Sequence, residues 1–234
     1  MTESAGGGED SSLLLRRLGH QLASNGAELA GTGSIEYIHH TATYQVTGSI
    51  LVGSKPVPAF KDTDFCDVHS WRSPDGTRKV IQTRNGRLQS TNGVRHPDSG
   101  PPQVEFDREN PLRAIDTESA LSVIASTGSL WKYRIIPPWL TGAILIDLSQ
   151  RPQVSAEVLT QNGHNMLTIS AEGISFDAPT KNILVLDTDT AMASMEYVFR
   201  GNSDAPQDDW EVVAEVNWLG FSRVESFEDP PVPD

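Results

Sequence analysis

Hydrophobic and polar residues alternate most regularly towards the end of the chain. Residues 194–200 and 210–218 both follow a period of two, which is typical of a strand with one face buried and the other in water. In the first segment Tyr197 and Phe199 are predicted to be buried, whereas Glu196 is predicted to face solvent. The two segments together predict a β-hairpin.

Asn-Gly pairs predict two further hairpins, because both residues of such a pair accept the positive φ angles of a tight two-residue turn. The pairs are Asn85-Gly86 and Asn162-Gly163, and strand-forming residues flank each of them. Another turn is predicted at residues 73–76, where proline and glycine follow one another closely. Strands are expected around these turns at residues 65–71, 78–83, 87–91, 154–160 and 166–171.

Residues 34–52 are rich in β-branched and aromatic side chains, which favours extended structure. The segment predicts two strands, with a break near residues 39–40 or near Gly48. Pro56 and Pro58 follow, and because proline donates no backbone hydrogen bond, they are expected to end the second strand.

Two other segments show helical spacing. Leucines recur along residues 11–24 after Asp10, and an apolar face follows Asp116 at residues 117–127. An aspartate in this position accepts hydrogen bonds from the free amides at the start of a helix. Both segments are expected to form helices that pack their apolar faces on the sheet.

The apolar segment at residues 130–148 is interrupted by Pro137 and Pro138. Two successive residues without amide donors rule out a continuous helix or a central strand, so the segment must bend or run along an edge. A bent apolar segment either packs permanently into the core or forms one wall of a ligand cavity, and we hypothesise the cavity. Its ligand-binding residues are predicted to be Trp131 and Trp139 on this segment and Tyr197, Phe199 and Trp218 on the opposing sheet.

These elements predict a single β-rich domain of the α+β class, in which two or three helices cover one curved antiparallel sheet. A chain of 234 residues fits one such domain, and 19 glycines with 15 prolines suit a fold with many turns. The domain is expected at residues 11–227. It lies between an acidic Gly-rich tail at residues 1–10 and an acidic Pro-rich tail at residues 228–234, both expected to be disordered.

Charge and composition exclude several kinds of partner. A net charge of −13 opposes binding to nucleic acid, because phosphates need a clustered positive surface. No apolar run reaches the roughly 20 residues of a membrane-spanning helix, so no integral membrane segment is expected. Residues 1–10 lack the features of a secretory signal. We therefore expect a cytoplasmic protein if the chain is complete, or an exported one if a signal lies upstream.

The six histidines fit no metal-binding motif. His39 and His40 are adjacent, so in a regular strand they point to opposite faces and cannot hold one ion together. We therefore expect no metal and no cofactor. Asp187 and Asp189 are interpreted as turn residues rather than as a pair of catalytic carboxylates.

The densest polar cluster that contains a nucleophile lies at residues 62–69. On a regular strand Cys66 and His69 point to opposite faces, so His69 cannot deprotonate the thiol directly. We interpret Cys66 as a buried structural thiol, and no catalytic residue is predicted. As the single cysteine of the chain, it also excludes an intrachain disulfide.

Positive charge is concentrated at residues 72–95, which we call the basic ribbon. We interpret it as a solvated face of an acidic protein, with an anionic ligand or partner as the alternative. Its basic residues are Arg72, Arg78, Lys79, Arg84, Arg87 and Arg95.

Three segments carry a resemblance to a known family. Residues 74–78 (Pro-Asp-Gly-Thr-Arg) and 84–87 (Arg-Asn-Gly-Arg) are similar to a strand–turn–strand element of the LolA/LolB-like superfamily of bacterial envelope proteins. Residues 183–199 resemble a corner of that fold in which Asp-x-x-Thr joins two strands. The resemblance implies an unclosed antiparallel β-barrel around a hydrophobic cavity, in a periplasmic or exported protein.

The function that this resemblance implies is non-enzymatic. It is the carriage or sensing of an apolar ligand, such as a lipid or an acyl chain. The alternative is a structural or interaction module that docks a protein partner through a sheet edge or through the basic ribbon.

Overall fold

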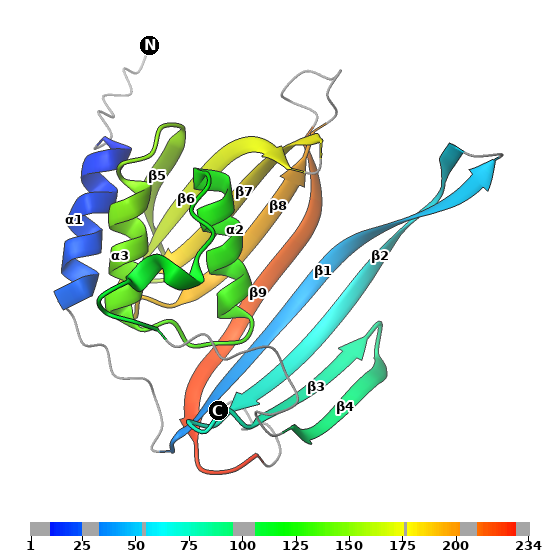
Figure 1. The fold of residues 1–234 in the computed structure, drawn as a ribbon, viewed down its shortest axis with the longest axis horizontal. Helices are drawn as coiled ribbons and strands as arrows, with labels where there is room; N and C mark the ends of the chain where they lie inside the picture. Colours follow the sequence, from blue (N-terminus) through cyan, green and yellow to red (C-terminus); the bar gives the residue numbers. More distant parts are fainter. Residues whose placement is uncertain are drawn as a thin grey trace.

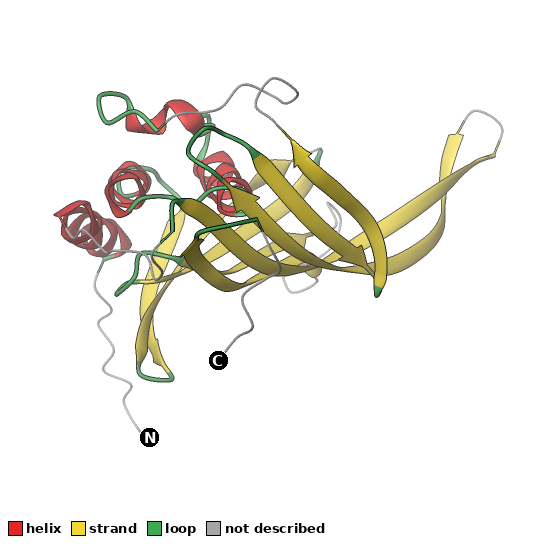
Figure 2. Ribbon diagram, turned by 90° about the horizontal axis from the view of Figure 1, so that it is seen from below, coloured by secondary structure: helices red, strands yellow, loops and turns green. Residues whose placement is uncertain are grey.

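A computed structural model describes most of the chain. The described residues are 10–24, 33–52, 55–95, 106–175, 177–201 and 210–227. Over these residues the chain forms one antiparallel sheet of nine strands with three α-helices on one of its faces (Figures 1 and 2). This confirms the predicted β-rich α+β fold. The tails predicted at residues 1–10 and 228–234 lie outside the described residues, except for Asp10.

The nine strands follow the order β4-β3-β2-β1-β9-β8-β7-β6-β5, so β1 pairs with β9 at the centre of the sheet. Over the described residues the sheet is not closed into a barrel, and β4 and β5 form its edges. The α-helices are α1 (Ser11–Ser24), α2 (Ala120–Trp131) and α3 (Pro138–Leu148), with a short 3-10 helix η2 (Pro111–Ala114) before α2. The strands are β1 (Ile35–Val52), β2 (Lys55–Arg72), β3 (Arg78–Arg84), β4 (Arg87–Arg95), β5 (Val154–Gln161), β6 (His164–Ser175), β7 (Ala178–Asp187), β8 (Ala193–Arg200) and β9 (Glu211–Val224).

Both Asn-Gly turns form as predicted. Asn85 and Gly86 join β3 to β4 with φ angles of 50° and 74°. Asn162 and Gly163 join β5 to β6 with φ angles of 53° and 84°. The hairpin of β8 and β9 also forms, although most of its predicted connection lies outside the described residues.

The first half of the sheet differs from the prediction. β1 is one long strand rather than two, and the expected breaks are irregularities in pairing, at His39 against β9 and at Gly48 against β2. Pro56 and Pro58 do not end the strand either, because β2 begins at Lys55. β3 pairs with β2 only from Cys66 onwards. Among the residues that the structure describes, the prolines therefore have a neighbouring strand on one side only and need no amide donor on the other.

The two predicted helices form. α1 has the expected bounds, and α2 begins after Ser119, whose hydroxyl accepts a hydrogen bond from the Ser122 amide at 3.0 Å. Asp116 was predicted to cap this helix, but it lies upstream, where its carboxylate accepts from the Glu118 amide. The prolines separate α2 from α3, which confirms the predicted bend. The third helix was not predicted, and Pro138 occupies its first turn, where a missing amide proton costs nothing.

The helices lie over the β5–β8 half of the sheet, and β1 to β4 extend beyond them (Figures 1 and 2). Their apolar side chains and those of the sheet form one continuous core that includes Leu15, Ile124, Leu145, Leu167 and Val216. None of the described helices is long and apolar enough to cross a membrane.

A second, smaller apolar cluster lies apart from the main core. It consists of Ile35, Tyr37 and Trp71, with Phe227 from the end of the described chain packed against it. Ile35 and Tyr37 alternate with Ile38 of the main core, so this cluster lies on the face of the sheet opposite to the helices. That outward face carries its own group of polar side chains, described below.

Candidate functional site

The predicted cavity residues separate into two groups. Trp131 is fully buried at the end of α2, and the Trp218 indole donates a hydrogen bond to its backbone oxygen at 3.1 Å. Trp139 lies half-buried on α3, with the Arg108 guanidinium 5.5 Å from its ring centre. Tyr197 and Phe199 contact each other on the outward face of β8, away from the helices. The structure therefore brings Trp131 and Trp218 together and does not bring Tyr197 or Phe199 to them.

The prediction for the faces of β8 is wrong. Glu196 is only 3% exposed and points towards α2, whereas Tyr197 is half-buried on the outward face. Glu196 is accommodated because the Lys132 ammonium lies 3.0 Å from its carboxylate. The absence of a side chain at Gly128 also makes room, since a Cβ there would lie 2.3 Å from a Glu196 oxygen.

In the buried ion pair of Lys132 and Glu196, the surroundings favour the charged form of the lysine. Burial disfavours the charged form of Lys132, but Glu196 and Tyr44 outweigh it and hold the pKa of Lys132 above its ordinary value. His40 lies on the same inward face. Its burial, and then the charge of Lys132, lower the pKa of His40 to about 4. His40 is therefore neutral at pH 7 and does not compete with the lysine for Glu196.

Trp218, which is 7% exposed, is among the residues that line a groove of about 350 Å³, which we call the Trp218 groove. It lies where the β5–β6 turn and the β7–β8 turn meet the irregularity in β9 at Leu219 and Gly220. All three methionines that follow Met1 in the sequence line it. Its apolar side chains are Met166, Met192, Ala193, Met195, Trp218, Leu219 and Phe221, and its polar ones include Asn162, His164 and Asp187.

A second hollow, of about 250 Å³, holds three arginines and one glutamate, and we call it the arginine pocket. The Arg134 Nε lies 3.7 Å from a Glu36 oxygen, and Arg223 donates to the Ser34 carbonyl at 3.4 Å. Burial, and then the charge of Arg134, lower the pKa of Arg72 to about 10. The pocket is lined by Ser34, Glu36, Arg72, Ser73, Pro74, Arg134 and Arg223.

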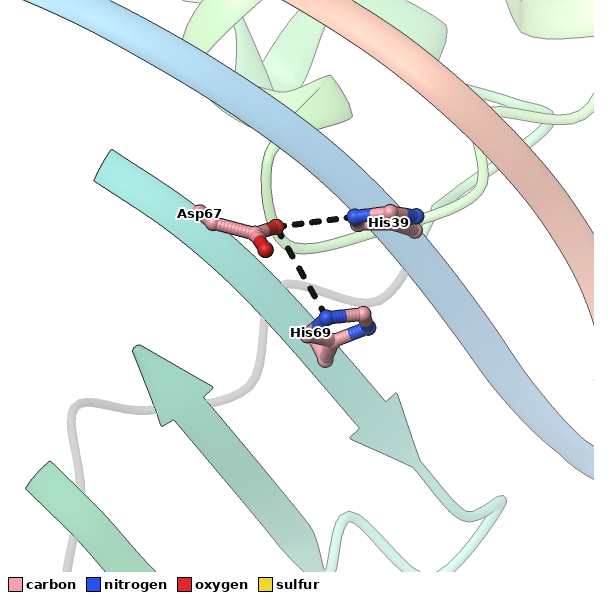
Figure 3. Close-up of side chains that lie close together, drawn as sticks. All are labelled: His39, Asp67 and His69. Atoms are coloured by element: carbon pink, nitrogen blue, oxygen red, sulfur yellow. Dashed lines mark hydrogen bonds and ion pairs between the residues drawn. The ribbon is translucent and has the colours of Figure 1, made fainter. Parts of the chain in front are cut away.

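The outward face of β1 and β2 brings His39, Asp67 and His69 together (Figure 3). The His39 Nε2 lies 2.8 Å from an Asp67 oxygen, and the His69 Nε2 lies 3.6 Å from the same atom. The two imidazoles stack with ring centres 4.1 Å apart. On its other side, the His69 Nδ1 lies 2.7 Å from the Tyr37 hydroxyl. We call the side chains of His39, Asp67 and His69 the His-Asp-His cluster.

The surroundings of His69 and Tyr37 favour the neutral form of each side chain. Burial, and then the neighbouring His39, lower the pKa of His69. Burial, with a contribution from Asp67, raises the pKa of Tyr37 to about 12. At pH 7 the Tyr37 phenol therefore keeps its proton.

The polar cluster at residues 62–69 divides between the two faces of β2, as predicted. Cys66 is buried, and its sulfur accepts a hydrogen bond from the Gln82 amide at 3.6 Å. Asp64, on the same face, is paired with Arg84 and accepts a hydrogen bond from Asn85 at 3.0 Å. His69 faces the other way, so the structure shows no activated thiol among the described residues.

Asp187 forms a turn, as predicted. One of its oxygens accepts hydrogen bonds from the amides of Asp189 at 2.8 Å and Thr190 at 3.3 Å. Its other oxygen lies 3.2 Å from the imidazole of His164, which is largely exposed. The carboxylate is thus engaged with the backbone between β7 and β8.

Sequence reasoning missed the His-Asp-His cluster and most of the Trp218 groove. Alternation along β2 placed Asp67 and His69 on one face, but nothing local indicates that His39 is the cross-strand partner of His69. That register depends on the whole β1–β2 ribbon. The sequence carried one signal for the groove, which is that three of the four methionines occur within residues 166–195.

The chain was also compared with known proteins. It matches no protein-family model, and no curated protein matches it.

Proposed function

We propose that the protein is a non-enzymatic binding protein for a small apolar ligand, such as a lipid acyl chain, and that the ligand lies in the Trp218 groove. The observation that carries this proposal is the convergence of Met166, Met192 and Met195 on Trp218 in an open groove. Ligand sites are mostly apolar hollows with a few polar groups that fix orientation, and about 300 Å³ is the lower end of their usual volume.

The chemistry of the groove favours a flexible apolar ligand. Methionine has an unbranched, polarisable side chain that adapts to different shapes, and it is over-used at surfaces that bind several apolar partners. The Trp218 indole proton is already bound to the Trp131 carbonyl, so the part of the ring that a ligand can contact is apolar. His164 and Asp187 at the rim supply polar contacts for one end of the molecule.

The proposed position differs from that of the LolA/LolB-like superfamily, in which the concave side of the sheet shelters the ligand. Here α2 and α3 fill that side with packed side chains, including the fully buried Ile124, Leu140 and Leu145. The groove lies instead at one end of the sheet. A ligand can enter it without displacing a helix.

A charge placed in the groove tests this proposal. Met195→Glu should weaken the binding of a fluorescent fatty acid by at least about tenfold, because an apolar chain would have to desolvate the new carboxylate. The matched control is Leu88→Glu, which introduces the same charge at an exposed position of β4 outside the groove. Circular dichroism and the melting temperature would show that both variants are folded. Equal affinities of the two variants would rule out the groove as the binding site.

The arginine pocket favours a second candidate function, the docking of an acidic segment of a protein partner. Among the described residues, the lining of this pocket includes three arginines and one glutamate, in a protein whose net charge is −13. Arginine binds carboxylates through two parallel hydrogen bonds, which suits an acidic side chain of a partner.

A short acidic peptide tests the docking function directly. Arg223→Gln should weaken the binding of hexaglutamate several-fold at low salt, because it removes one of the three guanidinium groups. Arg200→Gln, at an exposed position outside the pocket, is the control for net charge. Binding that both variants reduce equally would reflect general charge and not the pocket.

A further inference from the structure

The outward face of β1 and β2 gathers three groups that share a preference for metal ions. His39 and His69 are direct cross-strand partners, and Asp67 lies two residues before His69 on the same face. Neighbouring strands place such side chains about 5 Å apart at the Cβ atoms. Figure 3 shows the three side chains pointing towards one another from the two strands. We propose that the His-Asp-His cluster is a binding site for a divalent transition-metal ion of the Zn²⁺ type.

The separations of the ligand atoms suit one ion. In a tetrahedral site with bonds of about 2.0–2.1 Å, ligand atoms lie about 3.3 Å apart. Here the two imidazole nitrogens lie 2.8 Å and 3.6 Å from the same Asp67 oxygen, and all three ligand atoms lie within 4.8 Å of one another. The imidazoles are stacked, so each ring must turn slightly about its χ2 bond to direct its Nε2 at the ion.

A second layer of contacts orients one ligand. A histidine that binds a metal through Nε2 carries its proton on Nδ1 and donates it to a neighbouring oxygen. The His69 Nδ1 has such a neighbour, because the Tyr37 hydroxyl lies 2.7 Å away and is itself buried. The Trp71 ring lies against the same imidazole. The Tyr37 hydroxyl therefore favours the tautomer of His69 that leaves Nε2 free to bind an ion.

The type of ligand decides the type of ion. Two imidazoles and one carboxylate suit zinc and its neighbours, whereas calcium and magnesium require oxygen ligands. The ligand side chains are 26%, 35% and 18% exposed for His39, Asp67 and His69, so an ion can enter from solvent. Three protein ligands also leave the fourth position of a tetrahedral ion for water or for another molecule.

Another group of possible ligands, His164, Asp187 and Asp189, is less suited to an ion. The His164 side chain is 60% exposed, and one Asp187 oxygen already accepts the two amide protons of its turn. A metal there would share the Asp187 carboxylate with the hydrogen bonds that hold the β7–β8 connection. This group supplies an internal comparison for the test.

Zinc titration of the full chain, without a histidine tag, tests the proposal. In competition with a chromophoric chelator, the protein should bind one Zn²⁺ per chain, and neither Mg²⁺ nor Ca²⁺ should compete. His69→Gln and Asp67→Asn should each weaken Zn²⁺ binding by at least about 100-fold, because each removes a ligand. Tyr37→Phe keeps the buried ring but removes the hydroxyl, and it should weaken binding about 10- to 100-fold.

Two histidine variants are the matched controls. His164→Gln alters the exposed group near Asp187, and His20→Gln alters an exposed histidine on α1. Both should leave the affinity for Zn²⁺ unchanged. If His164→Gln abolishes binding while His69→Gln has no effect, the proposal is wrong.

A measurement on the wild-type protein avoids the risk that a variant does not fold. In a proton–nitrogen spectrum of the six histidine side chains, one equivalent of Zn²⁺ should shift two imidazoles, those of His39 and His69. An unchanged spectrum, or a change confined to His164, would overturn the proposal. It would leave the cluster as a hydrogen-bonded network that stabilises the β1–β2 ribbon.

Discussion

Glu196→Lys should destabilise the protein by about 3–5 kcal/mol in urea unfolding, because it replaces a buried ion pair with two adjacent buried ammonium groups. Glu196 is 3% exposed, and the Lys132 ammonium lies 3.0 Å from its carboxylate. The substitution removes the only negative charge of the pair and adds a positive one on the inward face of β8. The same substitution of a surface glutamate in a strand would lower the free energy of unfolding by less than about 1 kcal/mol.

Glu215→Lys is the control for this prediction. It makes the same change of charge in β9, at an outward-facing position opposite Tyr197. It should cost less than about 1 kcal/mol. Combining Glu196→Lys with Lys132→Glu restores an ion pair and should recover part of the lost stability. A small effect of Glu196→Lys would mean that the carboxylate faces solvent, as alternation along the strand had predicted.

Gly142→Val should cost about 3 kcal/mol or more, because it forces two helices apart. A Cβ at residue 142 of α3 would lie 2.5 Å from the Gly19 carbonyl oxygen and 2.8 Å from the Ala23 amide nitrogen of α1. These are backbone atoms, so they move only if the whole of α1 moves. Helix propensity alone predicts the opposite sign, since any ordinary residue is favoured over glycine in a helix. The expected loss therefore measures the close approach of the two helices.

Ala143→Val is the matched control, one residue along the same helix at a half-buried position. It introduces the same β-branched side chain at a position that already carries a Cβ, and we expect a loss of about 1 kcal/mol or less. Thermal unfolding of the two variants provides the measurement. If Gly142→Val is as stable as Ala143→Val, α1 does not pack on α3 in this way.

Local signals predicted the turns and the first two helices. Asn85-Gly86 and Asn162-Gly163 form the expected turns because their φ angles depend on these residues alone. α1 was predicted residue for residue, since a leucine stripe needs no knowledge of distant partners. α3 was missed because it is apolar on every side, buried between α1, α2 and the sheet, and so shows no helical period.

The faces and register of the strands depended on distant residues. β8 carries apolar residues on its outward face and a glutamate on its inward one. Lys132, which lies 64 positions away in the chain, pairs with that glutamate, and Gly128 leaves room for it. The position of His39 beside Asp67 likewise follows from the long β1–β2 register. Of the predicted ligand-binding residues, only Trp218 lies in the Trp218 groove.

The most direct test of the apolar binding function uses the methionine methyl groups. The chain has four methionines, of which Met166, Met192 and Met195 line the groove, and Met1 is outside the described residues. In a carbon–proton spectrum of protein labelled at the methionine methyls, a spin-labelled fatty acid should broaden the three groove resonances saturably, with half-maximal broadening at the same ligand concentration for each. Broadening of none of the three, or broadening that rises with ligand concentration without saturating, would contradict the proposal that the Trp218 groove binds an apolar ligand.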